Sequence, residues 1–208
     1  MTSPTQTTPA TPPPEPEFDL LVFWVQHRSK VVAITALLAI GLLVYFASEF
    51  LKTQKLNHSA RALATAKDEA GLRQVVSDYP GTAAAGNAQL LLAEQLRKAG
   101  KLDEAVTALR SFIDKHPEHA LISGAWTSLA ATQEIQGKAD EAMSTYQRIS
   151  TSFSASFSAP VALLGQARIF QQKGKTEDAR RLYDQVINQF PDTLFSSQAS
   201  RENQQLKK

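Results

Sequence analysis

Pairs of adjacent carboxylates are the side chains of this sequence that are best arranged for acid–base chemistry. They occur three times, as Asp103-Glu104, Asp140-Glu141 and Glu177-Asp178. Two neighbouring carboxylates can share the roles of proton donor and proton acceptor. However, the pairs recur at one fixed spacing, and each begins three residues after a glycine. This recurrence favours a structural role, because carboxylates in the first turn of a helix meet the positive end of its dipole.

The histidines are the candidates for metal binding. They are His27, His58, His116 and His119, in a chain without cysteine. Pro117 separates the last two and interrupts a helix, so their spacing does not place them on one face. No carboxylate or thiolate partner lies at ligand spacing, and no glycine-rich phosphate loop or nucleophile elbow is present. The sequence therefore predicts no catalytic residue, metal, cofactor or small-molecule substrate, and a protein that is not an enzyme.

The charge distribution argues against nucleic acid as a partner. The formal net charge is only +2 over 208 residues, and the lysines and arginines are scattered. A groove that follows phosphates needs a cluster of basic side chains. The absence of cysteine also excludes a lipid anchor attached through that residue.

A repeat of 37 residues positions the carboxylate pairs. Gly100, Gly137 and Gly174 lie on this spacing, and so do Pro80, Pro117 and Pro191, with Ser154 in place of the missing proline. Such self-similarity is typical of stacked helical hairpins. Each glycine is expected to end a first helix through a left-handed cap, and each proline to end the second helix.

The repeat predicts three complete hairpins after a degenerate half repeat. Their first helices are called A helices here, and their second helices B helices. The expected A helices are 82–98, 119–136 and 156–173, and the expected B helices are 102–116, 139–153 and 176–190. The half repeat contributes 53–67 and 68–79. We divide the chain into residues 53–80 (stalk and half repeat), 81–192 (three repeats) and 193–208 (a capping helix).

The segments before the repeats predict a membrane anchor. Residues 1–17 are rich in proline and threonine and offer almost nothing to bury, which is typical of a disordered tail. Residues 18–52 combine an interfacial lead-in with a membrane span. The stretch from Val31 to Ser48 carries no charge, and eighteen residues span roughly 27 Å, about the thickness of the hydrocarbon core. A cleaved signal peptide would start earlier, and a buried soluble helix would have a polar face. We expect lipid contact through residues 31–51.

The repeats resemble the tetratricopeptide (TPR) pattern W-x2-L-G-x2-Y, A-x3-F, P. The second repeat supplies Trp126, Leu129, Ala142 and Tyr146 at matching positions. Gln133 and Gln166 depart from the pattern by occupying apolar positions, as does Ser154 at the proline position. The fold class implied is all-α, with one transmembrane helix and a TPR-like α-solenoid of about three and a half repeats. Trp126 is expected to pack inside the molecule.

The resemblance implies that the A helices line a concave, partner-binding face. The residues expected on it are Leu90, Glu94, Arg97, Thr127, Ala131, Glu134, Leu164, Arg168 and Gln171. Relatives that grip acidic peptide termini carry lysine and asparagine here. Leu90, Thr127 and Leu164 replace the lysine, and Glu94, Ala131 and Arg168 replace the asparagine. A mixed apolar and polar groove of this kind suits an extended or helical peptide.

The order of elements resembles bacterial single-span TPR proteins typified by the YfgM-like ancillary subunits of the SecYEG translocon. That family implies a non-enzymatic, translocon-associated partner of periplasmic chaperones. It also implies an inner-membrane location with the amino terminus in the cytoplasm and the repeats in the periplasm, although the positive charges near the span favour cytoplasmic repeats. Two alternatives stay open. One is a coordinator of cell division or outer-membrane assembly, since two repeat phrases are also similar to Tol-Pal coordinator and BamD proteins. The other is a cytoplasm-facing TPR adaptor.

Overall fold

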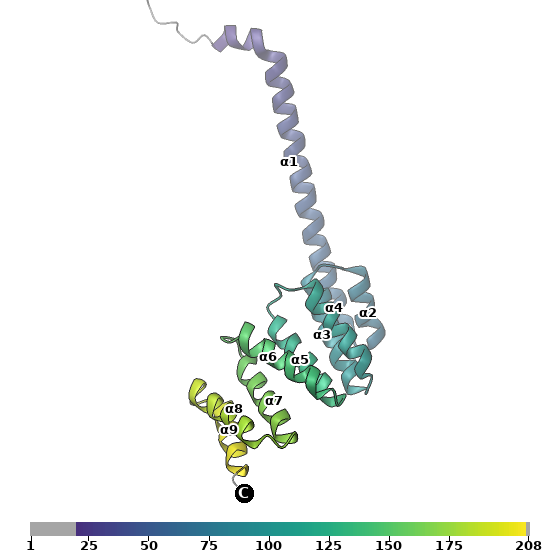
Figure 1. Cartoon of the computed structure of the whole chain (residues 1–208). Coiled ribbons are helices and arrows are strands. Elements are labelled where there is room, and N and C mark those ends of the chain that lie inside the picture. Colours follow the sequence, from purple (N-terminus) through teal and green to yellow (C-terminus); the bar gives the residue numbers. More distant parts are fainter. Residues whose placement is uncertain (1–19, 207–208) are drawn as a thin grey trace, which may run out of the picture. The chain divides into compact units, whose positions relative to one another are not determined.

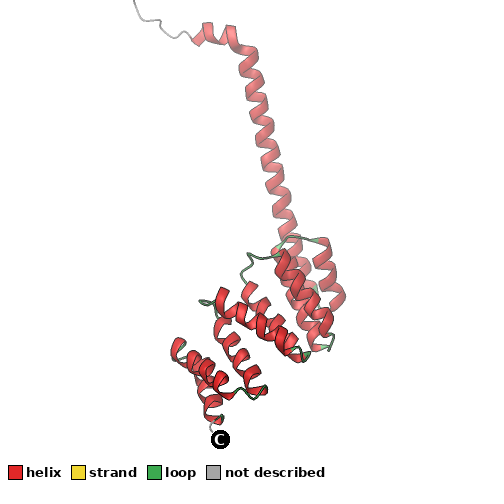
Figure 2. Ribbon diagram, viewed as in Figure 1, coloured by secondary structure: helices red, strands yellow, loops and turns green. Residues whose placement is uncertain are grey.

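The computed structural model describes residues 20–206 and contains only helices over that range (Figure 1, Figure 2). The predicted tail, residues 1–17, lies outside the described residues. The described helices are α1 (Leu20–Thr65), α2 (Glu69–Asp78), α3 (Ala83–Lys98), α4 (Leu102–Lys115), α5 (Ile122–Ile135), α6 (Ala139–Ser152), α7 (Ser158–Gln172), α8 (Thr176–Gln189) and α9 (Leu194–Gln205). Two compact units divide the chain after Thr53. The all-α prediction is confirmed.

The first unit consists of the start of α1, and its apolar side chains face outward in every direction. The most apolar window of 18 residues within Phe23–Thr65 has a mean hydropathy of 2.4, and none of it is buried within the protein. Such a helix is long and apolar enough to cross a membrane. The hydroxyls of Thr35 and Ser48 donate to the carbonyls of Val31 and Tyr45, at 2.8 Å each, so they add no unpaired polar group to this surface. Figure 1 shows a bend close to the start of α1.

The second unit stacks the remaining helices as hairpins. α3, α5 and α7 are the A helices, α4, α6 and α8 are the B helices, and α9 packs on α7 and α8 as a cap. The end of α1 and α2 form the half repeat, in which Ala62 and Leu63 pack against Leu72 and Val75. Ala105, Ala142 and Ala179 are fully buried where each A helix meets its B helix. The predicted solenoid is therefore confirmed, and each predicted helix within a complete repeat starts and ends within three residues of the observed one.

The repeating glycines end the A helices as predicted. Gly100, Gly137 and Gly174 have φ values of 74°, 76° and 71°, in the left-handed region. In the first turn, the N–H of Gly100 donates to Arg97 O at 3.1 Å, and the N–H of Lys101 to Leu96 O at 2.9 Å. This pair of bonds is the Schellman motif, which satisfies carbonyls that the helix end leaves free. The other two turns repeat it.

The segments just before α3, α5, α7 and α9 share a hydrogen bond that keeps the 37-residue spacing. A side chain at each of four equivalent positions accepts a bond from a backbone N–H: Thr82 from Ala85, His119 from Leu121, Ser156 from Ser158 and Thr193 from Ser196, at 3.1–3.2 Å. Such bonds satisfy donors at a helix start. Thr82 and Thr193 are the N-caps of α3 and α9, whereas His119 and Ser156 precede the N-caps of α5 and α7, so α5 begins at Ile122 rather than at residue 119.

The carboxylate pairs lie in the first turns of α4, α6 and α8, as predicted. Some of them also bridge neighbouring repeats. Glu104 pairs with Arg73 at 2.7 Å, and Glu141 with Arg110, its equivalent one repeat later, at 3.4 Å. Asp140 pairs with Lys173.

The departures from the TPR pattern compensate one another. Gln166 is buried on α7, and its Nε2 donates to Ser150 Oγ at 3.1 Å; Ser150 itself replaces an apolar residue on α6. Gln133 is buried as well, and its Oε1 accepts from Thr145 Oγ1 at 2.7 Å. A buried amide without partners would destabilise the fold, so these polar residues are tolerated in pairs.

Candidate partner-binding faces of the repeat stack

The A-helix face opens into a groove at the joint between α3 and α5, called the inner groove here. Its volume is about 190 Å³, and Leu109 of α4 contributes to its lining. The residues that line it are Leu90, Ala93, Glu94, Arg97, Leu109, Leu121, Gly124, Ala125, Ser128 and Thr132. Three predicted site residues, Leu90, Glu94 and Arg97, come together here. Arg97 and Lys98 both pair with Glu94, at 2.8 and 3.3 Å, so apolar and charged groups share one wall.

The next joint, between α5 and α7, is closed at the equivalent position. Tyr146 replaces Leu109, and Gly165 replaces Ser128. A Cβ on Gly165 would lie 2.5 Å from the Tyr146 ring, so only glycine lets the two helices approach this closely. Tyr146 is buried and fills the space that remains open between α3 and α5.

An ion pair spans this closed joint. Arg168 of α7 donates from Nε and Nη2 to the two carboxylate oxygens of Glu134 on α5, at 2.6 and 2.8 Å. The hydroxyl of Tyr146 donates to the same carboxylate at 3.1 Å. The predicted site residues Glu134 and Arg168 therefore hold each other, and this geometry stabilises the joint.

The electrostatics keep the pair charged. Burial alone would raise the pKa of Glu134, but the hydrogen bonds and charge of Arg168 outweigh burial and lower that pKa. Burial, followed by the charge of Glu134, raises the pKa of Tyr146. The bond to Glu134 raises the pKa of Arg168. At neutral pH the site holds an anion, a cation and a neutral phenol, and none of them is poised to exchange a proton.

The predicted residues not yet described, Leu164, Gln171, Thr127 and Ala131, lie in two places. Leu164, Arg168 and Gln171 line a smaller pocket of about 120 Å³ between α7 and α9, where Gln171 Oε1 accepts from Tyr183 Oη at 3.1 Å. Thr127 and Ala131 are half-buried on α5 and do not line the inner groove; Thr127 Oγ1 donates to Ser123 O at 2.9 Å. The nine predicted residues therefore form an interrupted series along the A-helix face.

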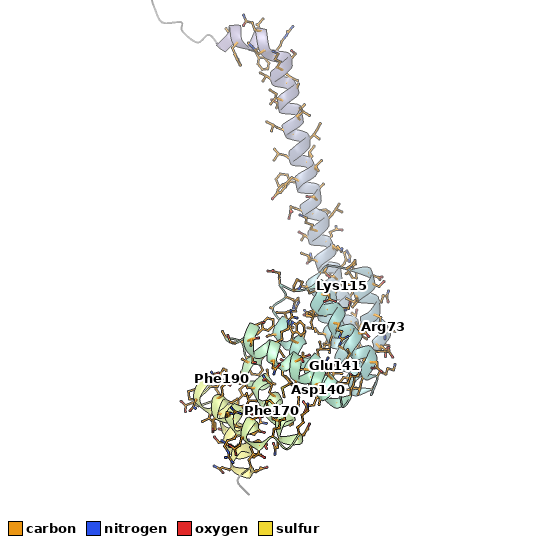
Figure 3. All side chains as sticks on the ribbon, viewed as in Figure 1. Arg73, Lys115, Asp140, Glu141, Phe170 and Phe190 are labelled. Carbon is orange, nitrogen blue, oxygen red and sulfur yellow. The ribbon has the colours of Figure 1, made fainter. Side chains whose placement is uncertain are left out.

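A larger groove lies between the B helices α2 and α4, with α3 as its floor, and is called the outer groove here. Its volume is about 510 Å³. Its lining consists of Arg73, Val76, Ser77, Gln89, Leu92, Leu96, Asp103, Glu104, Thr107, Ala108 and Ser111. Figure 3 labels Arg73 on α2, one wall of this groove. The predicted site residues all lie on the A-helix face, so none of them marks the outer groove. The available signal was the pair Gln89 and Ser111, which differ from their repeat equivalents Trp126 and Arg148.

Two of the histidines considered for metal binding, His116 and His119, pack against Phe112. The rings of His116 and His119 lie 5.3 and 5.1 Å from the ring of Phe112. Burial, followed by the charges of His119 and Lys115, lowers the pKa of His116. Over residues 20–206, no group of three histidines, aspartates or glutamates is arranged to hold a metal ion.

Comparison with known proteins identifies the family. The sequence profile of the tetratricopeptide repeat-like domain matches residues 23–199. The chain belongs to the tetratricopeptide repeat-like family. The match begins at residue 23, so it includes the apolar stretch of α1 together with the repeats. A search of curated proteins finds no match.

Solved structures share the TPR fold. A tetratricopeptide repeat protein from Parabacteroides merdae superposes with a TM-score of 0.56 at 15% identity, covering 74% of this chain. This chain spans only 59% of the length of that protein. The TPR-like repeats of a putative kinesin light chain from Podospora anserina superpose with a TM-score of 0.51 at 19% identity, covering 74% of this chain and 89% of theirs. At these identities the likeness shows the fold alone.

Proposed function

We propose that this TPR protein is a membrane-anchored scaffold of the bacterial cell envelope that binds other proteins through the inner groove. TPR domains mediate protein–protein interactions. Helix α1 contains the apolar stretch, and its last residues form the first helix of the repeat stack. The proposal is supported by the apolar stretch of α1 in combination with the inner groove between α3 and α5. The partner proposed is the translocon or a periplasmic chaperone, with the repeats in the periplasm and the amino terminus in the cytoplasm.

The chemistry of the inner groove supports a peptide ligand. Leu90 and Leu121 supply apolar contact, and the Glu94–Arg97 pair supplies a donor and an acceptor at the rim. Leu121 is 51% exposed, so it is free to contact a partner. Pockets of this composition fit an amphipathic helix or an extended segment with one apolar side chain.

The apolar part of α1 supports the anchor. Residues 31–47 present apolar side chains on all sides, which is favourable in lipid and unfavourable in water. Arg28 and Lys30 precede the stretch, and Lys52 and Lys55 follow it, where long basic side chains reach the headgroups. We propose lipid contact through residues 31–51.

A photo-crosslinking experiment tests the proposed partner. A photo-reactive amino acid would replace Leu121 in the inner groove, and a matched control would replace Leu194 of α9, which is 87% exposed and lies outside the groove. We expect adducts with a translocon subunit or a periplasmic chaperone from position 121 only, and a second change in the same groove, Leu90→Asp, should abolish them. Adducts with Tol-Pal or outer-membrane assembly proteins would support the coordinator role instead. Identical adducts from both positions would contradict a groove-based scaffold. A periplasm-active phosphatase fused after Lys208 tests the orientation, and an inactive fusion would indicate cytoplasmic repeats.

A further inference from the structure

We propose that the outer groove is a second docking site, and that it binds a partner segment with an aromatic side chain next to a lysine or arginine. The outer groove shares no lining residue with the inner groove. This inference therefore does not depend on the proposed function, and either one can fail alone. The volume of the outer groove, about 510 Å³, falls in the range of pockets that bind ligands, about 300–1,000 Å³.

The floor of the outer groove is apolar. Leu92 and Leu96 of α3 are nearly fully buried, and Val76 and Ala108 form the lower walls. Gln89 also lies on the floor, where its Nε2 donates to the carbonyl of Ala108 at 3.1 Å. An aromatic ring entering this space would bury apolar surface on both sides, which is the main source of affinity at such sites.

The second repeat shows which side chains occupy the equivalent space there. A groove between α4 and α6 is lined by seven residues, each equivalent to a lining residue of the outer groove, but its volume is about 260 Å³, roughly half. Trp126 occupies the position of Gln89, and Arg148 occupies that of Ser111. The Arg148 guanidinium lies over the Trp126 ring at 4.3 Å from its centroid, a cation–π contact. The fold itself therefore places an aromatic–cation pair in this groove, and the outer groove lacks that pair.

Charge at the rim favours a basic neighbour for the aromatic residue. Asp103 is 93% exposed at its side chain, and Glu104 is 53% exposed. The only basic residue of the lining, Arg73, is already held by Glu69 and Glu104 at 2.8 and 2.7 Å. A lysine or arginine of the partner would meet these carboxylates, whereas an acidic residue would be repelled.

Binding of defined peptides to the full chain in detergent micelles tests this proposal. The probe is a fluorescein-labelled peptide of sequence Gly-Ser-Trp-Lys-Ser-Gly, followed by fluorescence anisotropy. Two controls replace its tryptophan by alanine or its lysine by glutamate. We expect saturable binding of the probe, with each control about tenfold weaker or more. Equal binding of all three peptides, or no saturable binding of any, would overturn the proposal.

Two variants locate the binding to the outer groove. Gln89→Trp combined with Ser111→Arg builds the pair of the second repeat into the first, and we expect it to weaken probe binding about tenfold or more. Because this variant alters a buried position, circular dichroism must first show that it folds. Asp103→Lys changes only an exposed side chain and should shift the preference toward the glutamate peptide. Unchanged binding in both variants would show that the peptide adheres to the micelle or to another surface, and would refute the outer groove as its site.

Discussion

The first and second repeats have the same fold, but the second repeat holds larger side chains on both faces and leaves less open space at each. The inner groove lies beside Leu109, whereas the equivalent space of the second repeat holds Tyr146. The outer groove lies beside Gln89, whereas its equivalent holds Trp126. A few large side chains decide whether a repeat serves stability or leaves room for a partner. The first repeat therefore has an inner groove and the larger outer groove, whereas the second repeat has a packed joint with the third.

The largest expected effect comes from disturbing the closed joint. Gly165→Ala places a methyl group 2.5 Å from the Tyr146 ring, so the ring or the helix must move. We expect a loss of about 1–3 kcal/mol in the free energy of unfolding, as for other overpacked cores. Urea unfolding of the full chain in micelles, followed by circular dichroism, measures it.

Gly124 of α5 provides the matched control. A Cβ there meets nothing within 4 Å, so Gly124→Ala should stabilise the helix by about 0.5–1 kcal/mol. If the two alanine variants have equal stability, the closed joint does not depend on close approach at Gly165.

The next effect concerns the ion pair across the joint. A double-mutant cycle of Glu134→Gln and Arg168→Met should give a coupling energy of about 1 kcal/mol, because Glu134 is 15% exposed but Arg168 is 47% exposed and partly screened. The Glu94–Arg97 pair of the first repeat lies within one helix, and its side chains are 40% and 33% exposed. Its coupling should be only about 0.3–0.5 kcal/mol. Equal couplings would show that the pair does not tie α5 to α7.

The smallest effect is the pH dependence of the same pair. Arg168 lowers the pKa of Glu134 in the folded chain, so the stabilisation is fully present above the unfolded pKa of about 4.3. It is lost as the pH falls through the lower, folded pKa. The stability difference between the wild type and Glu134→Gln should stay constant from about pH 7 to 5 and shrink below about pH 4. A difference that grows on acidification would contradict the assignment.

The sequence was sufficient to predict the fold because its signals are local and repeated. Glycine at the left-handed cap, carboxylates in the next turn and proline at the end each act within a few residues, and the 37-residue spacing repeats them. The sequence predicted the grooves less completely than it predicted the fold. The sequence period shows which residues lie on the A helices. Whether a groove is open depends instead on the sizes of the side chains that meet at a joint, as for Tyr146 and Gly165. The outer groove required a comparison of repeats at Gln89 and Trp126, which local patterns do not provide.

The polar pairing of Gln166 with Ser150 has a consequence for how the stack comes apart. That bond joins the second repeat to the third, at the same interface as the Glu134–Arg168 pair and Tyr146. Each interface in a repeat protein contributes its own coupling between neighbours, and cooperativity follows the strongest. We therefore expect the second and third repeats to unfold together, and the first repeat to open separately from them.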